Sequence, residues 1–287
     1  MPHWKLTLAY DGTTFHGWQV QPHLPTIQGT LAAALHDITG EAVLPQGSGR
    51  TDAGVHALAQ VASVTLHSPI PAANLHRALN RILPPSIRIL SAEQVPETFH
   101  ARLSALQKTY EYRIFERRPE ASGTADTDRI CPPFQSPYLW DCRFPLNLAA
   151  MQQAAADLLG THNFTSFAAS DPDLTQRSAE QMPVILSEGS RLCEPESKDL
   201  HEPSPPPAPP TLSAPNPTKT IHAATLHRTP ETLTFTITGS GFLHHMVRNI
   251  VGTLVEIGRG AFPPNCIPAI LAAHNRKAAG PTAPARG

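Results

Sequence analysis

A proline-rich stretch in the second half of the chain sets the strongest limit on what it can fold into. Residues 203–210 read Pro-Ser-Pro-Pro-Pro-Ala-Pro-Pro, and the surrounding segment, about 170–218, is rich in Pro, Ser and Glu. Such a segment buries too little apolar surface to offset the entropy of ordering it. Its length is also unusual for a loop inside a compact domain. We therefore predict that it is a disordered or polyproline-like insert, and that any core is built from the residues on either side.

The charge of the chain is unevenly distributed. Residues 170–202 carry eight acidic and three basic side chains, so the rest of the chain has a net charge of +4 although the whole has −1. Because the remainder is only mildly basic, a nucleic-acid partner depends on where Lys and Arg cluster. Four cysteines without a C-x-x-C pair indicate neither a zinc site nor a disulfide framework, and favour a reduced, cytoplasmic setting. The N-terminus has no signal-peptide pattern, and no apolar run is long enough to span a membrane.

Apolar periodicity predicts a mixture of strands and helices in both halves. Strands are predicted at 3–10, 41–44, 58–66, 86–95, 108–116, 220–228 and 232–239. Helices are predicted at about 27–38, 71–82, 147–159, 243–257 and 265–275, the first with Thr26 as its N-cap. The stretch 117–144 is predicted to be irregular. We expect an α+β protein with an N-terminal domain, residues 1–105, and a C-terminal domain, residues 106–287, which contains the insert.

The glycine-rich loop at 47–57 is the candidate active site. Gly49 and Gly54 flank Arg50-Thr51-Asp52, and glycines let the backbone turn sharply and let a substrate come close. Arg50 can pair with Asp52 and hold the carboxylate ionised and oriented, which makes it a usable nucleophile or base. On these residues alone, a surface turn with a solvated ion pair is the commoner outcome. A phosphate cradle is a further alternative, although 47–54 matches neither glycine-rich nucleotide-binding pattern.

Several blocks in order along the chain resemble the TruA family of tRNA pseudouridine synthases. Residues 49–57, Gly-Arg-Thr-Asp-Ala-Gly-Val-His-Ala, are similar to the active-site signature of that family. Further matching blocks lie at 10–19, 26–28, 79–84, 99–102, 108–112, 159–167 and 242–252. The resemblance covers roughly residues 3–168 and 219–286, and this collinear set is far more specific than any single motif.

The resemblance implies an isomerase that converts uridine to pseudouridine at positions 38, 39 and 40 in the anticodon stem-loop of tRNA. It implies no cofactor and no metal, a homodimer, and two similar mixed-sheet halves flanking a basic active-site cleft. Asp52 falls on the nucleophile of the family, Arg50 on its carboxylate partner and Tyr110 on the residue that stacks against the target base. The carboxylate could attack C1′ or C6 of the nucleotide, or assist a glycal route, and the residues do not choose among these.

Other basic residues are candidate phosphate ligands, because RNA recognition of this kind begins with shape and backbone. Arg102 and Arg248 are favoured, since they fall inside the matching blocks. The remaining candidates are Arg77, Arg81, Lys108 and Arg113.

Histidines and tryptophans offer further candidates. His244 and His245 suggest a metal site, but neighbouring positions on a helix point about 100° apart. We therefore expect no two-ligand clamp from this pair. His56 could orient a substrate or pack beside the loop, and packing is favoured. Trp4 and Trp18 are expected to be anchors in the core or the loop rather than surfaces for base stacking.

Two departures from the family and two alternative functions remain at this point. The segment 170–218 is longer than the family usually has there; its acidic excess could shield part of the RNA-binding face or belong to a solvated insert, and we favour the insert. Residues 283–287 resemble a family block that normally continues into a final apolar strand, so either the chain is truncated or it lacks that strand and exposes a sheet edge. A non-catalytic RNA-binding module is the main alternative, and the presence of Asp52, Arg50 and Tyr110 argues against it. A nucleotide-binding enzyme that uses 47–54 as a phosphate cradle is the second.

Overall fold

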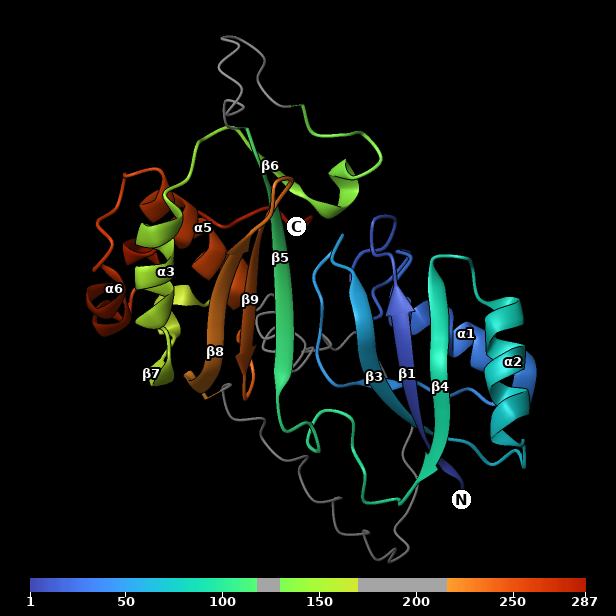
Figure 1. Cartoon of the computed structure of the whole chain (residues 1–287). Coiled ribbons are helices and arrows are strands. Elements are labelled where there is room, and N and C mark those ends of the chain that lie inside the picture. Colours follow the sequence, from blue (N-terminus) through green and yellow to red (C-terminus); the bar gives the residue numbers. More distant parts are fainter. Residues whose placement is uncertain (118–129, 170–215) are drawn as a thin grey trace, which may run out of the picture.

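A computed structural model describes residues 1–117, 130–169 and 216–287. Within these ranges the chain forms two β-sheets, each with its own hydrophobic core. In Figure 1 the helices of each half lie on the outer side of their sheet, so that the sheets are next to each other in the middle. The α+β class is confirmed.

The first sheet has the strand order β2-β3-β1-β4, and all of its pairings are antiparallel. Its strands are β1 (His3–Tyr10), β2 (Gln46–Gly47), β3 (Ala57–Thr65) and β4 (Ile87–Val95). Helices α1 (Ile27–Thr39) and α2 (Ala72–Ile82) complete this half. Every second residue of β1 is buried, as its alternating sequence predicts. Thr26 caps α1 by accepting a hydrogen bond from the Gly29 N–H, as predicted.

The second sheet has the order β6-β5-β9-β8-β7, with β5 and β6 parallel and the other pairs antiparallel. Its strands are β5 (Lys108–Glu116), β6 (Trp140–Cys142), β7 (Gly160–Asn163), β8 (Thr218–Arg228) and β9 (Leu233–Gly239). Its helices are α3 (Leu148–Ala156), α5 (Met246–Gly258) and α6 (Ile267–Ala273), with 3₁₀ turns η1 (Ser136–Tyr138), η2 (Thr165–Phe167) and η3 (Arg276–Ala278). The proposed domain boundary at residues 105–106 falls between β4 and β5.

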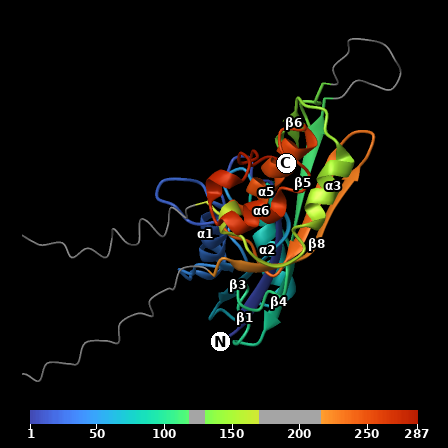
Figure 2. The same ribbon diagram turned by 90° about the vertical axis from the view of Figure 1, so that its left-hand side faces the viewer.

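The last residues of the chain run back to the second sheet. Both views place the C-terminus beside β5 and β6 (Figures 1 and 2), and the Tyr112 hydroxyl of β5 donates to the carbonyl oxygens of Pro284 and Arg286. Ala283 is buried. This stretch therefore packs as part of the second half.

Some predicted elements differ from the structure. The strand predicted at 41–44 is wrong: the Glu41 carboxylate accepts hydrogen bonds from the backbone of His67 and Ser68, and the strand pairing begins later, at Gln46. The stretch 117–144, predicted to be irregular, contains η1 and the short strand β6, and 118–129 lie outside the described residues. The predicted insert also lies outside them, over 170–215. No helix in the described ranges is long and apolar enough to cross a membrane.

Candidate active site

The segment that follows β1 packs against the loop between β2 and β3 and fixes its backbone. The backbone N–H of Trp18 donates to the Thr51 carbonyl oxygen over 3.0 Å. The Thr51 hydroxyl lies 2.8 Å from the Tyr10 hydroxyl. Gly17 has a φ of +82°, and a Cβ there would lie 2.5 Å from the Thr51 carbonyl oxygen. The backbone next to Asp52 is thus fixed by close packing that only glycine permits.

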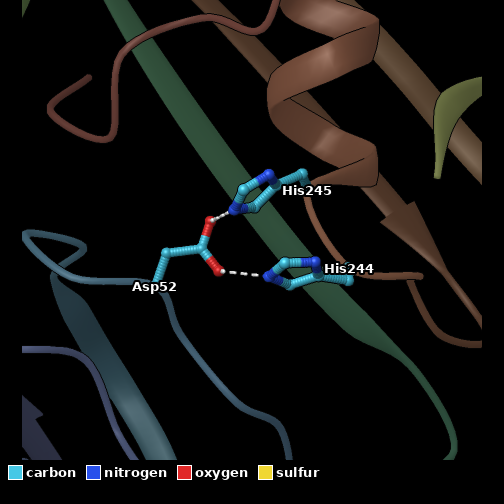
Figure 3. A group of neighbouring side chains, drawn as sticks. All are labelled: Asp52, His244 and His245. Carbon is cyan, nitrogen blue, oxygen red and sulfur yellow. Dashed lines mark ion pairs between the residues drawn. The ribbon is translucent and has the colours of Figure 1, made fainter. Parts of the chain in front are cut away.

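The Asp52 carboxylate lies next to three side chains from the other half of the molecule. Two of them directly precede α5, and the third belongs to its first turn. Arg248 donates from Nη1 to Oδ2 over 2.8 Å, and Nε2 of His245 lies 3.1 Å from the same oxygen. Nε2 of His244 lies 3.7 Å from Oδ1. Figure 3 shows both imidazoles pointing at the carboxylate. Because the Asp52 side chain keeps about a quarter of its surface exposed, a substrate can still reach it.

The direction of the two imidazoles comes from an irregular turn before α5. His245 has the left-handed conformation with a φ of 57°, so the helix begins only at Met246. The rings of His244 and His245 stack with their centres 3.9 Å apart. The expectation that the pair diverges on a helix is therefore wrong, since neither residue is helical. Burial lowers the pKa of His245, while the nearby Asp52 charge opposes that shift.

Arg248 is held by the C-terminal stretch as well as by Asp52. Its Nε donates to the Ala283 carbonyl oxygen over 2.8 Å, and the Ala283 N–H donates back to the Arg248 carbonyl oxygen. Gly252, one turn later in α5, lets this stretch come close, because a Cβ there would lie 1.7 Å from the Pro281 carbonyl oxygen. Arg248, predicted as a phosphate ligand, thus contacts the Asp52 carboxylate, and its role in RNA binding stays a prediction.

Arg50 lies two residues before Asp52 in the same loop and is exposed. Its predicted pairing with Asp52 stays a prediction. No local spacing indicates the contact of Asp52 with Arg248, since the two are 196 residues apart.

Tyr110, on β5, lies near the same carboxylate. Its ring is half-buried and meets the Phe242 ring edge-to-face, with centroids 5.0 Å apart. Burial raises the pKa of Tyr110 to about 12, and the charge of Asp52 adds to the shift. The phenol is therefore protonated at neutral pH, beside the Asp52 carboxylate.

Arg102, Lys108 and Lys219 lie next to the glycine-rich loop at 47–57. Lys108, the first residue of β5, donates from Nζ to the Ser48 carbonyl oxygen. Burial lowers the pKa of Lys108, and the charges of Arg102 and Lys219 lower it further. Within the ranges that the structure describes, no carboxylate forms an ion pair with any of the three. These three residues form one electropositive patch, which we call the cation cluster. Its members are Arg102 in the loop before β5, Lys108 on β5 and Lys219 on β8.

The sequence matches a family model described as tRNA pseudouridine synthase over residues 7–103 and 210–287. The chain belongs to the tRNA pseudouridine synthase family. A protein of Solibacter usitatus, named tRNA pseudouridine synthase A, is 45% identical over 99% of this chain and 95% of its own length. Proteins of the same name from Moorella thermoacetica and Rhodopseudomonas palustris are 41% and 38% identical, over all of this chain and 97% and 96% of their own lengths. The resemblance noted in the sequence is confirmed.

The other arginines predicted to bind phosphate are exposed and do not belong to the cation cluster. They are Arg77, Arg81 and Arg113. Arg77 donates to Asn74 along α2, and Arg81 lies on the same helix. Arg113, on β5, forms an ion pair with Glu111 over 2.6 Å. None of the three has a described contact with Asp52. Their role in RNA binding stays a prediction.

His56 joins the family's signature loop to the second half of the molecule. Its Nδ1 accepts a hydrogen bond from the Gly12 N–H, which leaves Nε2 to donate to the Pro137 carbonyl oxygen. Its ring packs against that of Tyr138, whose hydroxyl donates to Asp11. His56 thus packs, as expected, and also bridges the two halves. Trp4 and Trp18 are both buried, as expected.

Proposed function

We propose that this chain isomerises uridine to pseudouridine at positions 38, 39 and 40 in the anticodon stem-loop of tRNA, with Asp52 as the nucleophile. One observation carries the proposal in a chain of this family. The Asp52 carboxylate lies where the two halves meet, and Arg248 and two imidazoles surround it while part of it stays exposed.

The reaction requires that the N1–C1′ bond breaks, that the uracil turns, and that C5 bonds to C1′. C5 loses its proton and N1 gains one, so the product is an isomer of the substrate. A carboxylate can attack C1′ or C6, or assist a glycal route, and the geometry is compatible with each. Arg248 donates a hydrogen bond to Oδ2 of Asp52 and fixes that oxygen, so Oδ1 is available for the nucleotide.

The target base must leave its stack to reach Asp52, and Tyr110 offers an aromatic surface beside the carboxylate. Base–aromatic stacking contributes about 1–3 kcal/mol, which corresponds to roughly 5- to 150-fold in affinity. We expect the variant Tyr110→Ala to bind tRNA more weakly by a factor in this range, and Tyr110→Phe to bind as the wild type does. Filter binding measures both. Turnover lost in Tyr110→Phe with binding intact would give the hydroxyl a part in proton transfer and refute a purely stacking role.

The cation cluster is proposed to bind phosphates of the RNA backbone. The plot of log K against log salt concentration has a negative slope, and each lost phosphate contact makes it less steep by about 0.7–0.9. We expect Arg102→Gln and Lys219→Gln each to weaken tRNA binding and to reduce this slope by about that amount. Arg259→Gln is the control and is expected to leave the slope unchanged, because Arg259 is an exposed arginine after the end of α5 that already pairs with Glu256. Equal slopes in all the variants would remove the cluster from the RNA interface.

The enzyme and its main alternative differ in one measurement. The wild-type protein is incubated with unmodified tRNA that carries 5-tritiated uridine, and the product is mapped for pseudouridine. Tritium release, with pseudouridine at positions 38, 39 and 40, is expected because C5 loses its hydrogen. Binding without release would identify a non-catalytic RNA-binding module. Protection by ATP or NAD against thermal unfolding would support a nucleotide-binding enzyme instead.

We also propose that the protein acts as a homodimer in the cytoplasm and needs no cofactor. The relatives that share its whole length are named for a reaction on tRNA, which a cytoplasmic protein would meet. Light scattering on the purified protein tests the dimer.

A further inference from the structure

We propose that Asp52, His244 and His245 form a binding site for a divalent transition-metal ion, best suited to Zn²⁺, and that the bound ion blocks isomerisation. The three side chains each offer a ligand atom, and these atoms lie within 4.8 Å of one another. Figure 3 shows the two imidazoles converging on the carboxylate from one side. Small rotations of side chains that are each about three-quarters buried would bring the three atoms to a common centre.

The turn before α5 is what makes neighbouring residues usable as a pair of ligands. A left-handed conformation is uncommon for residues other than glycine and costs free energy. His245 adopts it, with a φ of 57°, and the turn aims Nε2 of both His244 and His245 at the same carboxylate. A regular helix would direct the imidazoles about 100° apart. The geometry of a chelating pair is thus built into the backbone.

The donor set selects the kind of ion. Two imidazole nitrogens and one carboxylate oxygen are a ligand set that zinc uses, with a fourth position left for water. The same set suits Co²⁺ and Ni²⁺, whereas Mg²⁺ prefers oxygen ligands in an octahedral arrangement. Among the described residues, this is the one group of at least three His, Cys, Asp or Glu side chains with such spacing.

Arg248 limits how tightly the ion can bind. Its guanidinium donates to Oδ2 of Asp52, so the ion is expected to take Oδ1, the oxygen nearer to His244. The positive charge of Arg248 repels a divalent cation at this range. The ion is therefore exchangeable rather than permanently held. A metal on Oδ1 occupies the oxygen that would otherwise face the nucleotide, and this inhibitory effect rests on the proposed function of Asp52.

Binding can be measured without reference to activity. The full-length protein is titrated with Co²⁺, whose visible absorption reports imidazole and carboxylate ligation, and Zn²⁺ is then used to displace it. We expect one ion per chain. In the variant His245→Asn, which keeps a residue tolerant of the left-handed turn, we expect affinity to fall at least about tenfold, since loss of even an outer-shell partner costs 10–100-fold. His274→Asn is the matched control and is expected to bind as the wild type does, because His274 has a similar left-handed φ of 46° at the end of α6.

Activity provides a second, separate readout. Zn²⁺ is expected to inhibit tritium release from tRNA, and EDTA to restore it. If the wild type releases no tritium at all, the proposed function fails while the cobalt spectrum still decides the metal site. The metal site itself is overturned if the wild type gives no cobalt spectrum. It is equally overturned if a variant with both His244→Ala and His245→Asn binds Zn²⁺ as tightly as the wild type.

Discussion

Replacing Asp52 with asparagine is expected to abolish isomerisation and to leave tRNA binding intact. Asparagine has the same shape and can still accept a hydrogen bond from Arg248 through its amide oxygen. It carries no negative charge, however, and is therefore a poor nucleophile toward C1′ or C6 and a poor base for a glycal route. Loss of a catalytic group of this kind typically lowers turnover by about 10⁴-fold or more.

The measurement compares tritium release, tRNA binding and thermal unfolding in the variant and in a control. Asp37→Asn is a suitable control, because Asp37 is an exposed aspartate on α1. We expect the control to keep full activity, and both variants to unfold near the wild-type temperature. Unimpaired release from Asp52→Asn would remove Asp52 from the reaction.

Removing Arg248 is expected to have the second-largest effect. Arg248 bonds Asp52 through Nη1 and Ala283 through Nε, so one planar group joins the carboxylate to the C-terminal stretch. Arg248→Met removes both bonds and leaves a part-buried carboxylate without this cation. We expect turnover to fall about 10²- to 10³-fold, the usual cost of losing a preorganised electrostatic contact in an active site.

The conservative change Arg248→Lys separates positioning from packing. Lysine keeps the charge but lacks the planar fork that bonds both partners at once. We expect it to recover part of the turnover lost in Arg248→Met, with a kcat below that of the wild type and a KM close to it. Circular dichroism checks that both variants are folded. Wild-type turnover in folded Arg248→Met would show that the contact has no part in the reaction.

Local signals predicted most of the regular structure. The alternation in 3–10 gave the bounds of β1, because that strand has one buried face. The pattern in 108–116 gave the bounds of β5, although its last three residues are all buried. Thr26 marked the start of α1, since the hydroxyl of an N-cap residue bonds to the backbone a few residues away. The short strands β6 and β7 were missed, because three or four residues hold too little of a period to be read.

The candidate site was only partly predictable. Asp52 and Tyr110 were found because family blocks contain them, and their roles stay predictions. The contact between Asp52 and Arg248 was not foreseen, since it depends on how two sheets lie together. The turn at His245 was also missed, because nothing in the residue type announces a left-handed conformation. Local sequence thus specified the elements, while the arrangement of the halves specified the carboxylate's partners.

The contact between Asp52 and Arg248 also has a consequence for how the protein is made. A ribosome adds about 5–20 residues per second, so Arg248 is synthesised roughly 10–40 s after Asp52, which lies 196 residues earlier. The first sheet is built from residues 3–95 and can form while the rest is still being translated. Asp52 would then lack its contact with Arg248 until residues up to Ala283 have left the exit tunnel. A nascent chain would therefore not have the complete set of Asp52 contacts until its second half has folded.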